Sequence, residues 1–152
     1  MTLDTTRALI ETVLETVADI GHVHLHPRVG IIREEEEAKL LTGSSPTRKV
    51  QVWEIQTAPE VFHDGCGGLH RTELEVSITG WWYVDDSGAS REEFATRIRD
   101  VSLALMDPIT GFAQILEPGI SVVIDDGPTK LRSGHAAWRG TLDFRLLDVV
   151  TT

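Results

Sequence analysis

Apolar residues recur at helical spacing in two stretches of the chain. Residues 4–19 and 90–106 each carry apolar side chains three and four positions apart, which places them in one stripe along a helix. The stripes consist of Ile10, Val13, Leu14 and Val17 in the first stretch, and of Phe94, Ile98, Val101 and Leu105 in the second. The second stretch begins at Ser90, and Glu93 follows at the spacing of a capping box. The pattern therefore predicts two amphipathic helices.

Five other stretches have the composition or the alternation of β-strands. They are residues 22–26, 50–57, 71–84, 120–124 and 136–149. In the two longest, apolar residues alternate with polar or charged ones, so one face is predicted to meet the core and the other to meet water or a partner. Gly80 interrupts the apolar face of one of them, which indicates a bend or the close approach of another element.

The order of these elements predicts an α+β fold. Short connections between consecutive strands favour antiparallel pairing, and two amphipathic helices pack most simply on one face of a sheet. We therefore expect a mainly antiparallel four- or five-stranded sheet with two helices packed on one face. Residues 1–152 are expected to form a single domain, because no internal repeat or second domain is visible. Residues 30–48 contain a glutamate run and a Gly-Ser-Ser-Pro break, so they are expected to be a long mobile excursion from the sheet.

Composition narrows the classes of function. The chain has 152 residues and a formal net charge of −10, from 14 Lys+Arg against 24 Asp+Glu. A surface of this charge repels phosphate, which argues against general binding to nucleic acid or to anionic membranes. No apolar run approaches the roughly 18 residues of a membrane helix, and the N-terminal stretch is not typical of a secretory signal. The single cysteine, Cys66, cannot form a disulfide within the chain, so we expect a reducing compartment or a free thiol.

Three histidines alternate along the first predicted strand. His22, His24 and His26 would share one strand face, about 6.5–7 Å apart between successive positions, which suits a metal site if a carboxylate joins them. The alternative is that Val23 and Leu25 face the core and the histidines face solvent. Because no spaced carboxylate motif accompanies the histidines, we expect no bound metal and no cofactor. A metal-binding or small-molecule-binding module on this strand is kept as the alternative function.

A second candidate site lies at residues 63–70. His63, Asp64, Cys66 and His70 occur there among three glycines. A cysteine near a histidine suits a nucleophile or a zinc site, but the flanks match no protease signature and one cysteine makes a poor structural zinc site. Asp-Gly and Gly-Gly pairs are typical of hairpin turns, so a glycine-rich loop is the simpler interpretation. No nucleotide-binding, zinc-protease or serine-hydrolase motif occurs in the chain, and we expect no catalytic residues and no enzyme activity.

A run of four acidic residues is the first candidate for contact with a partner. It consists of Glu34, Glu35, Glu36 and Glu37. The run is either an acidic surface presented to a basic partner or to the lumen of an assembly, or a solvated face.

Two aromatic residues are the second candidate for such contact. Trp81 and Tyr83 alternate with Trp82, so they are predicted on the outer face of the sheet if Trp82 lies in the core. There they would either anchor an interface or be partly covered by neighbouring side chains. Arg139 and Arg145 are predicted on the corresponding face of the last strand, and they complete the set of interface candidates.

The order of elements resembles that of a family of virion proteins. Three stretches carry the likeness: ALIETVLETVADIGHVHLHPR, TELEVSITGWWYVDDSGASREEFATRIRDVSLALM and AAWRGTLDFRLLDVV. In this order of helix, short strand, long strand, acidic turn, capped helix and closing strand, the chain is similar to the tail-terminator and tail-completion (minor tail) proteins of long-tailed bacteriophages and prophages. The likeness covers most of the chain but not residues 30–48 or 63–70.

The resemblance implies a structural role without catalysis. Proteins of this kind cap the tail tube as a ring, often of six copies, stop tube polymerisation and meet the head connector. The implied partners are further copies of the chain, the tail tube and the head-connector proteins, with DNA only passing through a lumen and no membrane. The implied location is the virion tail, after assembly in the host cytoplasm. Acidic residues such as Glu34–Glu37 around a lumen would let DNA pass by charge repulsion.

Overall fold

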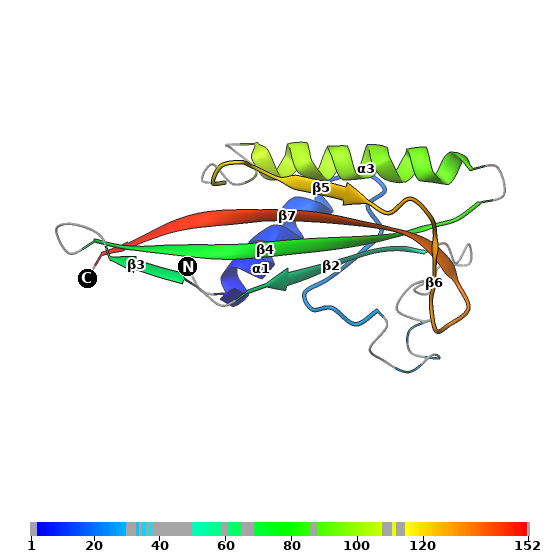
Figure 1. Cartoon of the computed structure of the whole chain (residues 1–152), viewed down its shortest axis with the longest axis horizontal. Helices are drawn as coiled ribbons and strands as arrows, with labels where there is room; N and C mark the ends of the chain where they lie inside the picture. Colours follow the sequence, from blue (N-terminus) through cyan, green and yellow to red (C-terminus); the bar gives the residue numbers. More distant parts are fainter. Residues whose placement is uncertain are drawn as a thin grey trace.

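Two helices and seven strands make up the described part of the chain in the computed structural model (Figure 1). The structure describes residues 3–29, 33, 35, 37, 50–58, 61–64, 69–85, 88–107, 111 and 115–151. The helices are α1 (Leu3–Glu15) and α3 (Ala89–Met106). The strands are β1 (His22–His24), β2 (Gln51–Thr57), β3 (Val61–Asp64), β4 (Leu69–Tyr83), β5 (Ser121–Ile124), β6 (Thr129–Lys130) and β7 (Ala136–Thr151). No described helix is both long enough and apolar enough to cross a bilayer.

The strands form one sheet whose main path runs β1-β2-β4-β7-β5. β4 and β7 are its long central pair, and they run antiparallel from Leu69 opposite Thr151 to Tyr83 opposite Ala137 (Figure 1). β3 pairs with β4 beyond the end of β2, and β6 pairs with β7 beyond the end of β5. β1 lies parallel to β2, whereas the other pairs are antiparallel. The predicted α+β fold with a mainly antiparallel sheet is confirmed.

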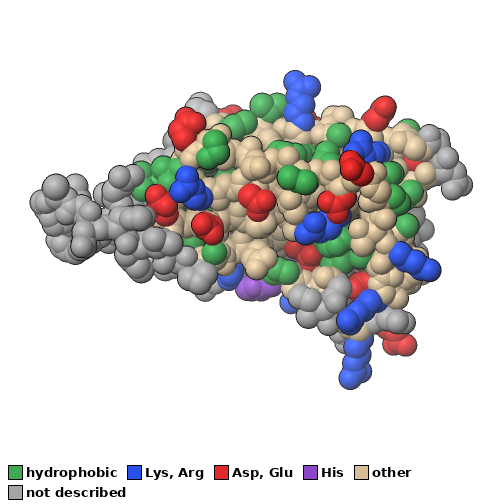
Figure 2. Space-filling model, viewed as in Figure 1, with side chains coloured by type: hydrophobic (Ala, Val, Ile, Leu, Met, Phe, Trp, Pro, Cys, Tyr) green, Lys and Arg blue, Asp and Glu red, His purple; other side chains and the backbone are tan. Residues whose placement is uncertain are grey.

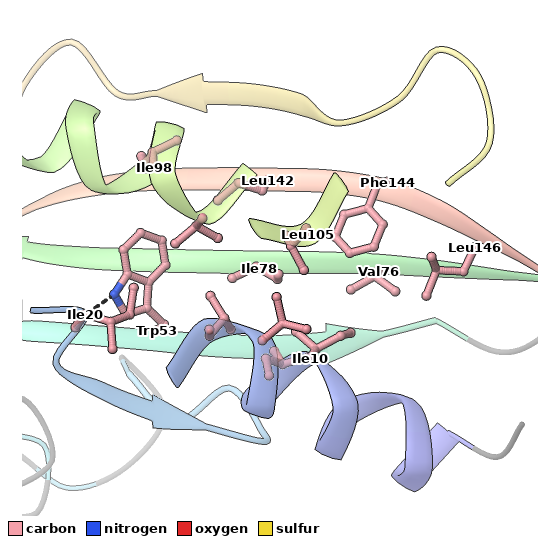
Figure 3. Packing of buried hydrophobic residues seen from close by; sticks show 14 of the residues in the cluster. Ile10, Ile20, Trp53, Val76, Ile78, Ile98, Leu105, Leu142, Phe144 and Leu146 are labelled. Carbon is pink, nitrogen blue, oxygen red and sulfur yellow. Dashed lines mark hydrogen bonds between the residues drawn. The ribbon is translucent and has the colours of Figure 1, made fainter. Parts of the chain in front are cut away.

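Both helices pack on one face of the sheet, as predicted, and the main core lies in this layer (Figure 3). The apolar stripes that the sequence predicts are the buried ones, except that Val17 is half-buried. From the helices the core takes Ile10, Val13, Leu14, Phe94, Ile98, Val101 and Leu105, and from the strands it takes Trp53, Ile55, Leu74, Val76, Ile78, Trp82, Leu142, Phe144 and Leu146. Removing this apolar area from water is the main force that holds the helices on the sheet.

Two glycines pair across the centre of the sheet beneath α3. Gly80 on β4 lies opposite Gly140 on β7. A Cβ at Gly80 would lie 2.7 Å from the Trp53 ring, and one at Gly140 would lie 2.6 Å from the side chain of Ile98. The Phe94 ring lies close to both glycines, and the Ile98 side chain lies close to Gly140. Because neither glycine has a side chain, these two side chains of α3 can pack directly on the sheet. The expected close approach at Gly80 is therefore confirmed.

The connection from α1 into the sheet is held by Trp53. Its indole N–H donates to the carbonyl oxygen of Ile20 at 2.8 Å, shown as the dashed line in Figure 3. Gly21 follows with a φ of +90°, and its Cα faces the backbone of Gln51 so closely that a side chain would collide with it. A glycine is needed here for both reasons.

Several local expectations are corrected. α1 ends at Glu15, and β1 ends at His24. Part of the predicted loop at residues 63–69 belongs to β3 and β4, while residues 65–68 lie outside the described residues. The predicted excursion at 30–48 lies largely outside them too. β6 was not predicted, since two residues carry no periodic signal.

The predicted capping box at α3 is wrong. The helix is capped at Gly88, which has a φ of 76° and forms no side-chain cap. Ser90 instead exchanges hydrogen bonds with Asp85: the Asp85 N–H donates to the Ser90 hydroxyl at 3.1 Å, and the Ser90 N–H donates to Asp85 Oδ1 at 3.2 Å. The carboxylate of Glu93 does not turn back to the helix end but accepts the hydroxyl of Tyr83 at 2.7 Å.

Candidate interaction surface

The candidate surface is the side of the sheet opposite the helices, which we call the open face. Its members follow from strand register, because side chains that are opposite each other in neighbouring strands point to the same face. They are His22 and His24 on β1, Val52, Glu54 and Gln56 on β2, Glu73, Glu75, Ser77, Thr79 and Trp81 on β4, Arg139, Thr141, Asp143 and Arg145 on β7, and Ser121 and Val123 on β5. In Figure 1 the central strands pass in front of α1, and Figure 2, viewed from the same side, shows charged side chains of both signs scattered among polar ones.

One end of the open face is covered by other parts of the chain. A second buried cluster lies there and consists of Val50, Val52, Trp81, Leu131 and Ala137, with Val29 and Tyr83 packed against it. Trp81 lies on the open face, as predicted, and it is 8% exposed, so of the two alternatives for this residue the structure shows the one in which neighbouring side chains cover it. The reason is that two segments return over this end, one at Val29 and one at Leu131 after β6.

A buried carboxylate organises this covered end. Glu54 on β2 is 4% exposed. Its Oε2 accepts the backbone N–H groups of Arg28 and Val29, the latter at 3.0 Å, and its Oε1 accepts the indole N–H of Trp81 at 2.9 Å. These donors matter because a buried carboxylate without partners is strongly destabilising. Sequence reasoning missed Glu54, although a single charge between two apolar residues of a strand was a usable signal.

A second buried carboxylate comes from the glutamate run. The Glu37 side chain is fully buried, and its Oε1 accepts the backbone N–H of Ser133 at 3.2 Å. The Glu37 N–H also donates to the carbonyl oxygen of Arg33 at 2.8 Å, which closes one helical turn. The prediction that Glu37 belongs to an acidic outer surface is therefore wrong, because a hydrogen bond to a distant turn draws it inward. Glu35 is exposed, and Glu34 and Glu36 lie outside the described residues.

Tyr83 is half-buried and turned toward α3. Its hydroxyl donates to Glu93, and its ring stacks on that of Trp82 with the ring centroids 5.9 Å apart. Burial, followed by the hydrogen bond to the Glu93 carboxylate and that carboxylate's charge, raises the pKa of Tyr83 to about 12. Its role as an interface anchor stays a prediction.

The two predicted interface arginines both have partners within the chain. The guanidinium of Arg139 lies over the Trp81 ring, 5.7 Å from the centroid, and 3.8 Å from the Asp125 carboxylate. The guanidinium of Arg145 lies 3.4 Å from the Glu73 carboxylate and donates at 2.8 Å to the carbonyl oxygen of Glu117. Because both pairs are partly exposed, each contributes little to stability and leaves the side chains accessible at their edges.

A groove of about 510 Å³ opens on the uncovered part of the open face. Gln56, Ser77, Asp143 and Ser121 are opposite one another in successive strands, so they form one polar row across it. Glu75 lies in the next row, and the loop at Pro118 and Gly119 forms one wall. Glu75 and Asp143 are exposed, and neither forms an ion pair with another described residue.

The groove presents charged and neutral hydrogen-bonding groups side by side. Among the described residues that line it there are carboxylates, hydroxyls, an amide and an arginine, but no histidine or cysteine. Free carboxylates beside neutral hydrogen-bonding groups suit a cationic or polar side chain from a partner.

The β5 edge of the sheet is apolar and exposed. β5 is the last strand of the sheet path, and its sequence, SVVI, contains no charge. Val122 is 44% exposed and Val123 is 53% exposed. Natural edge strands usually carry charges, prolines or bulges that prevent pairing with other chains. β5 contains neither a charged residue nor a proline. Val123 lies on the open face, on the same strand as the groove residue Ser121.

The histidines do not converge on a metal site. His22 and His24 lie on the open face beside Val52 and Glu54, whereas His26 lies outside β1. His22 and His26 are exposed, and His24 is half-buried. In the part of the chain that the structure describes, no group of three or more His, Cys, Asp or Glu side chains is placed to hold a metal ion. Val23 and Leu25 pack against the main core, as predicted.

The second candidate site falls partly outside the described residues. Cys66 is not among them. Asp64 on β3 is opposite His70 on β4 in the register, and His63 is opposite Arg71. These residues therefore belong to a strand pair and not to a free loop.

No protein-family model and no curated protein matches the chain. The surfaces described above are therefore the basis on which a function can be proposed.

Proposed function

We propose that the chain is a structural protein of a phage or prophage tail, which caps the tail tube as a ring and joins the tail to the head connector. The likeness in element order to tail-terminator and tail-completion proteins supports the proposal. The α+β fold, with two helices on one face of the sheet and an open opposite face, is compatible with it. The groove on the open face and the exposed valines of β5 are features of a contact surface, and they support a structural role.

The observation that carries the proposal is the uncovered apolar edge at β5. In an isolated subunit, exposed valines on an unpaired edge strand favour aggregation. A neighbouring copy that covers β5 would remove both valines from water and would pair the outward backbone groups of the strand. A ring is the arrangement in which one head-to-tail contact is repeated until it closes, so that the edge of every copy is covered.

Genetic deletion tests the function directly. We expect that deleting the gene from a bacterial strain that carries it, followed by induction of the prophage, leaves heads and tails unjoined and tails of irregular length in electron micrographs. Complementation with the wild-type gene should restore joined particles. Joined particles of normal length from the deletion strain would rule the proposal out.

Self-association tests the role of the β5 edge. Light scattering across protein concentration, with negative-stain images of the same samples, should show rings for the wild type and smaller species for Val123→Lys. Leu9→Lys is the matched control, because Leu9 is 41% exposed on α1, in the helix layer. Equal ring formation by all three proteins would show that β5 is not the contact surface.

A further inference from the structure

Four exposed basic side chains lie together at one end of the molecule, which we call the basic end. They are Arg28, Arg33, Lys130 and Arg132. Figure 2 shows Lys and Arg side chains gathered at the end where Figure 1 places β6. None of the four forms an ion pair with another residue that the structure describes. Their charge is therefore available to a partner.

The two buried glutamates bring these residues together from distant parts of the chain. Glu54 accepts the N–H groups of Arg28 and Val29, and Val29 packs against the cluster that contains Leu131. Leu131 is the residue between Lys130 and Arg132. Glu37 joins the turn that begins at Arg33 to the backbone of Ser133. The basic end is thus held by internal hydrogen bonds, so that little ordering is required when it binds.

The basic end is an exception on a strongly acidic chain. Without its four cations, the formal charge of −10 would be −14. With the exposed Glu35 and the buried Glu37 and Glu54, the described formal charges at the basic end sum to +1, from four cations and three carboxylates. Five charges lie in and beside the groove on the open face: Glu73, Glu75, Glu117, Asp143 and Arg145. They sum to −3, from four carboxylates and one guanidinium.

We propose that the basic end of one copy docks in the groove of the next copy, with Lys130 and Arg132 against Glu75 and Asp143. The inference rests on the proposed assembly into a ring and names its interface. The two surfaces carry opposite charge, and opposite potentials across an interface favour the correct partner and raise the rate of encounter. Glu75 and Asp143 are free to receive the contact, because neither is paired with another described residue.

The position of the two surfaces makes the contact head-to-tail. Lys130 pairs with Ala136 at the start of β7, whereas Asp143 lies seven residues further along, about 24 Å away at 3.4 Å per residue. The basic end therefore does not reach the groove of its own chain along this strand. A contact between two different patches of identical subunits repeats in one direction, and it closes into a ring where the rotation allows. A copy seated in the groove would also lie beside Val123, which extends the contact to the β5 edge.

Single charge reversals with matched controls test the contact. Arg132→Glu and the control Arg99→Glu both change the net charge to −12, and Arg99 is exposed on α3. Asp143→Lys and the control Glu15→Lys both change it to −8, and Glu15 is exposed on α1. In sedimentation equilibrium at low salt, we expect the two interface variants to weaken association about tenfold or more. The two controls should associate like the wild type.

A mixture of the two interface variants gives the decisive measurement. Arg132→Glu keeps the acidic groove, and Asp143→Lys keeps the basic end, so the two proteins are complementary. In an assembly where the two proteins alternate, every second contact is between the two substituted surfaces. There the acidic side chain introduced at position 132 meets the basic side chain introduced at position 143, so the charges are again opposite. We expect an equimolar mixture to recover association near the wild-type strength, whereas each variant alone stays weak. A mixture of either interface variant with its own control variant should associate more weakly than the mixture of the two interface variants.

Several outcomes would overturn the inference. Unchanged association of both interface variants, a mixture that gains nothing, or a wild type that stays monomeric up to about 1 mM would each exclude the contact. Binding of a fluorescent DNA duplex that Arg132→Glu abolishes, together with unchanged self-association, would assign the basic end to nucleic acid instead. The gene deletion distinguishes this failure from failure of the proposed function, because its readout is the particle and not the interface.

Discussion

Trp81 and Glu54 are diagonal neighbours on adjacent strands, and the indole N–H of Trp81 donates to the buried Glu54 carboxylate at 2.9 Å. The same carboxylate accepts two backbone N–H groups from Arg28 and Val29. One charged side chain therefore satisfies three donors and holds a returning segment against the sheet. Without it, the buried indole N–H of Trp81 would have no acceptor, which costs more than the bond itself contributes.

Glu54→Ala should destabilise the fold strongly. Because one buried and two part-buried donors lose their acceptor, we expect the free energy of unfolding to fall by about 3 kcal/mol. Glu54→Gln keeps an acceptor oxygen but loses the charge, so a smaller loss of about 1 kcal/mol is expected. Urea denaturation measures both changes. Glu75→Gln, at an exposed carboxylate on the same face of the sheet, should stay within about 0.5 kcal/mol of the wild type, and an equal loss there would contradict the role of Glu54.

Gly80→Ala and Gly140→Ala should each destabilise the sheet beneath α3. The new methyl group would lie 2.7 Å from the Trp53 ring in the first and 2.6 Å from Ile98 in the second, so the core must shift. Overpacking of this kind costs about 1–3 kcal/mol. Thermal or urea unfolding checks the loss. Gly127→Ala is the matched control, because nothing lies within 4 Å of the position that its new methyl group would take, and its stability should be unchanged.

Tyr83 should titrate late, and the fold should lose stability at high pH. The pKa of Tyr83 is raised from 10.0 to about 12, first by burial and then by Glu93. Above pH 10 the unfolded chain releases the phenol proton while the folded chain still holds it. The stability that is fully present below pH 10 is therefore lost between about pH 10 and 12. Near-ultraviolet absorbance measures the titration without ambiguity, because Tyr83 is the one tyrosine of the chain.

Two variants check the cause of this shift. Glu93→Gln removes the carboxylate charge, so the pKa of Tyr83 should fall toward its ordinary value while burial keeps part of the shift. Tyr83→Phe should remove the late absorbance change altogether. A Tyr83 that titrates near pH 10 in the wild type would show that the hydroxyl is not held by Glu93.

Glu37→Ala should loosen the segment that contains Arg33. The buried carboxylate holds this turn to the backbone of Ser133, and its loss leaves that N–H without the acceptor. Limited digestion with trypsin should then cut faster after Arg28 and Arg33, both of which are exposed. Glu35→Ala is the control, because Glu35 belongs to the same glutamate run but is exposed. Equal cutting rates for both variants would show that Glu37 does not anchor the segment.

The sequence alone determined the elements and the class of fold. Both apolar stripes and the alternation along the two long strands are local signals, since each depends on the spacing of neighbours in the chain. They predicted α1, α3 and the core face of β4 and β7, with ends wrong by a few residues. The glycine at position 80 also indicated a close approach, although only the structure showed that Gly140 is its partner across the sheet.

Tertiary structure decided which polar residues are buried and which surfaces are free. Glu37 and Trp81 look like surface residues in the sequence, but segments distant in the chain cover them. Burial of a carboxylate depends on donors that come from elsewhere in the fold, such as the N–H groups of Ser133 or Val29, and no local pattern encodes them. For the same reason, the sequence could not place Lys130 and Arg132 beside Arg28, or Glu75 beside Asp143, because charges group only after the strands have paired.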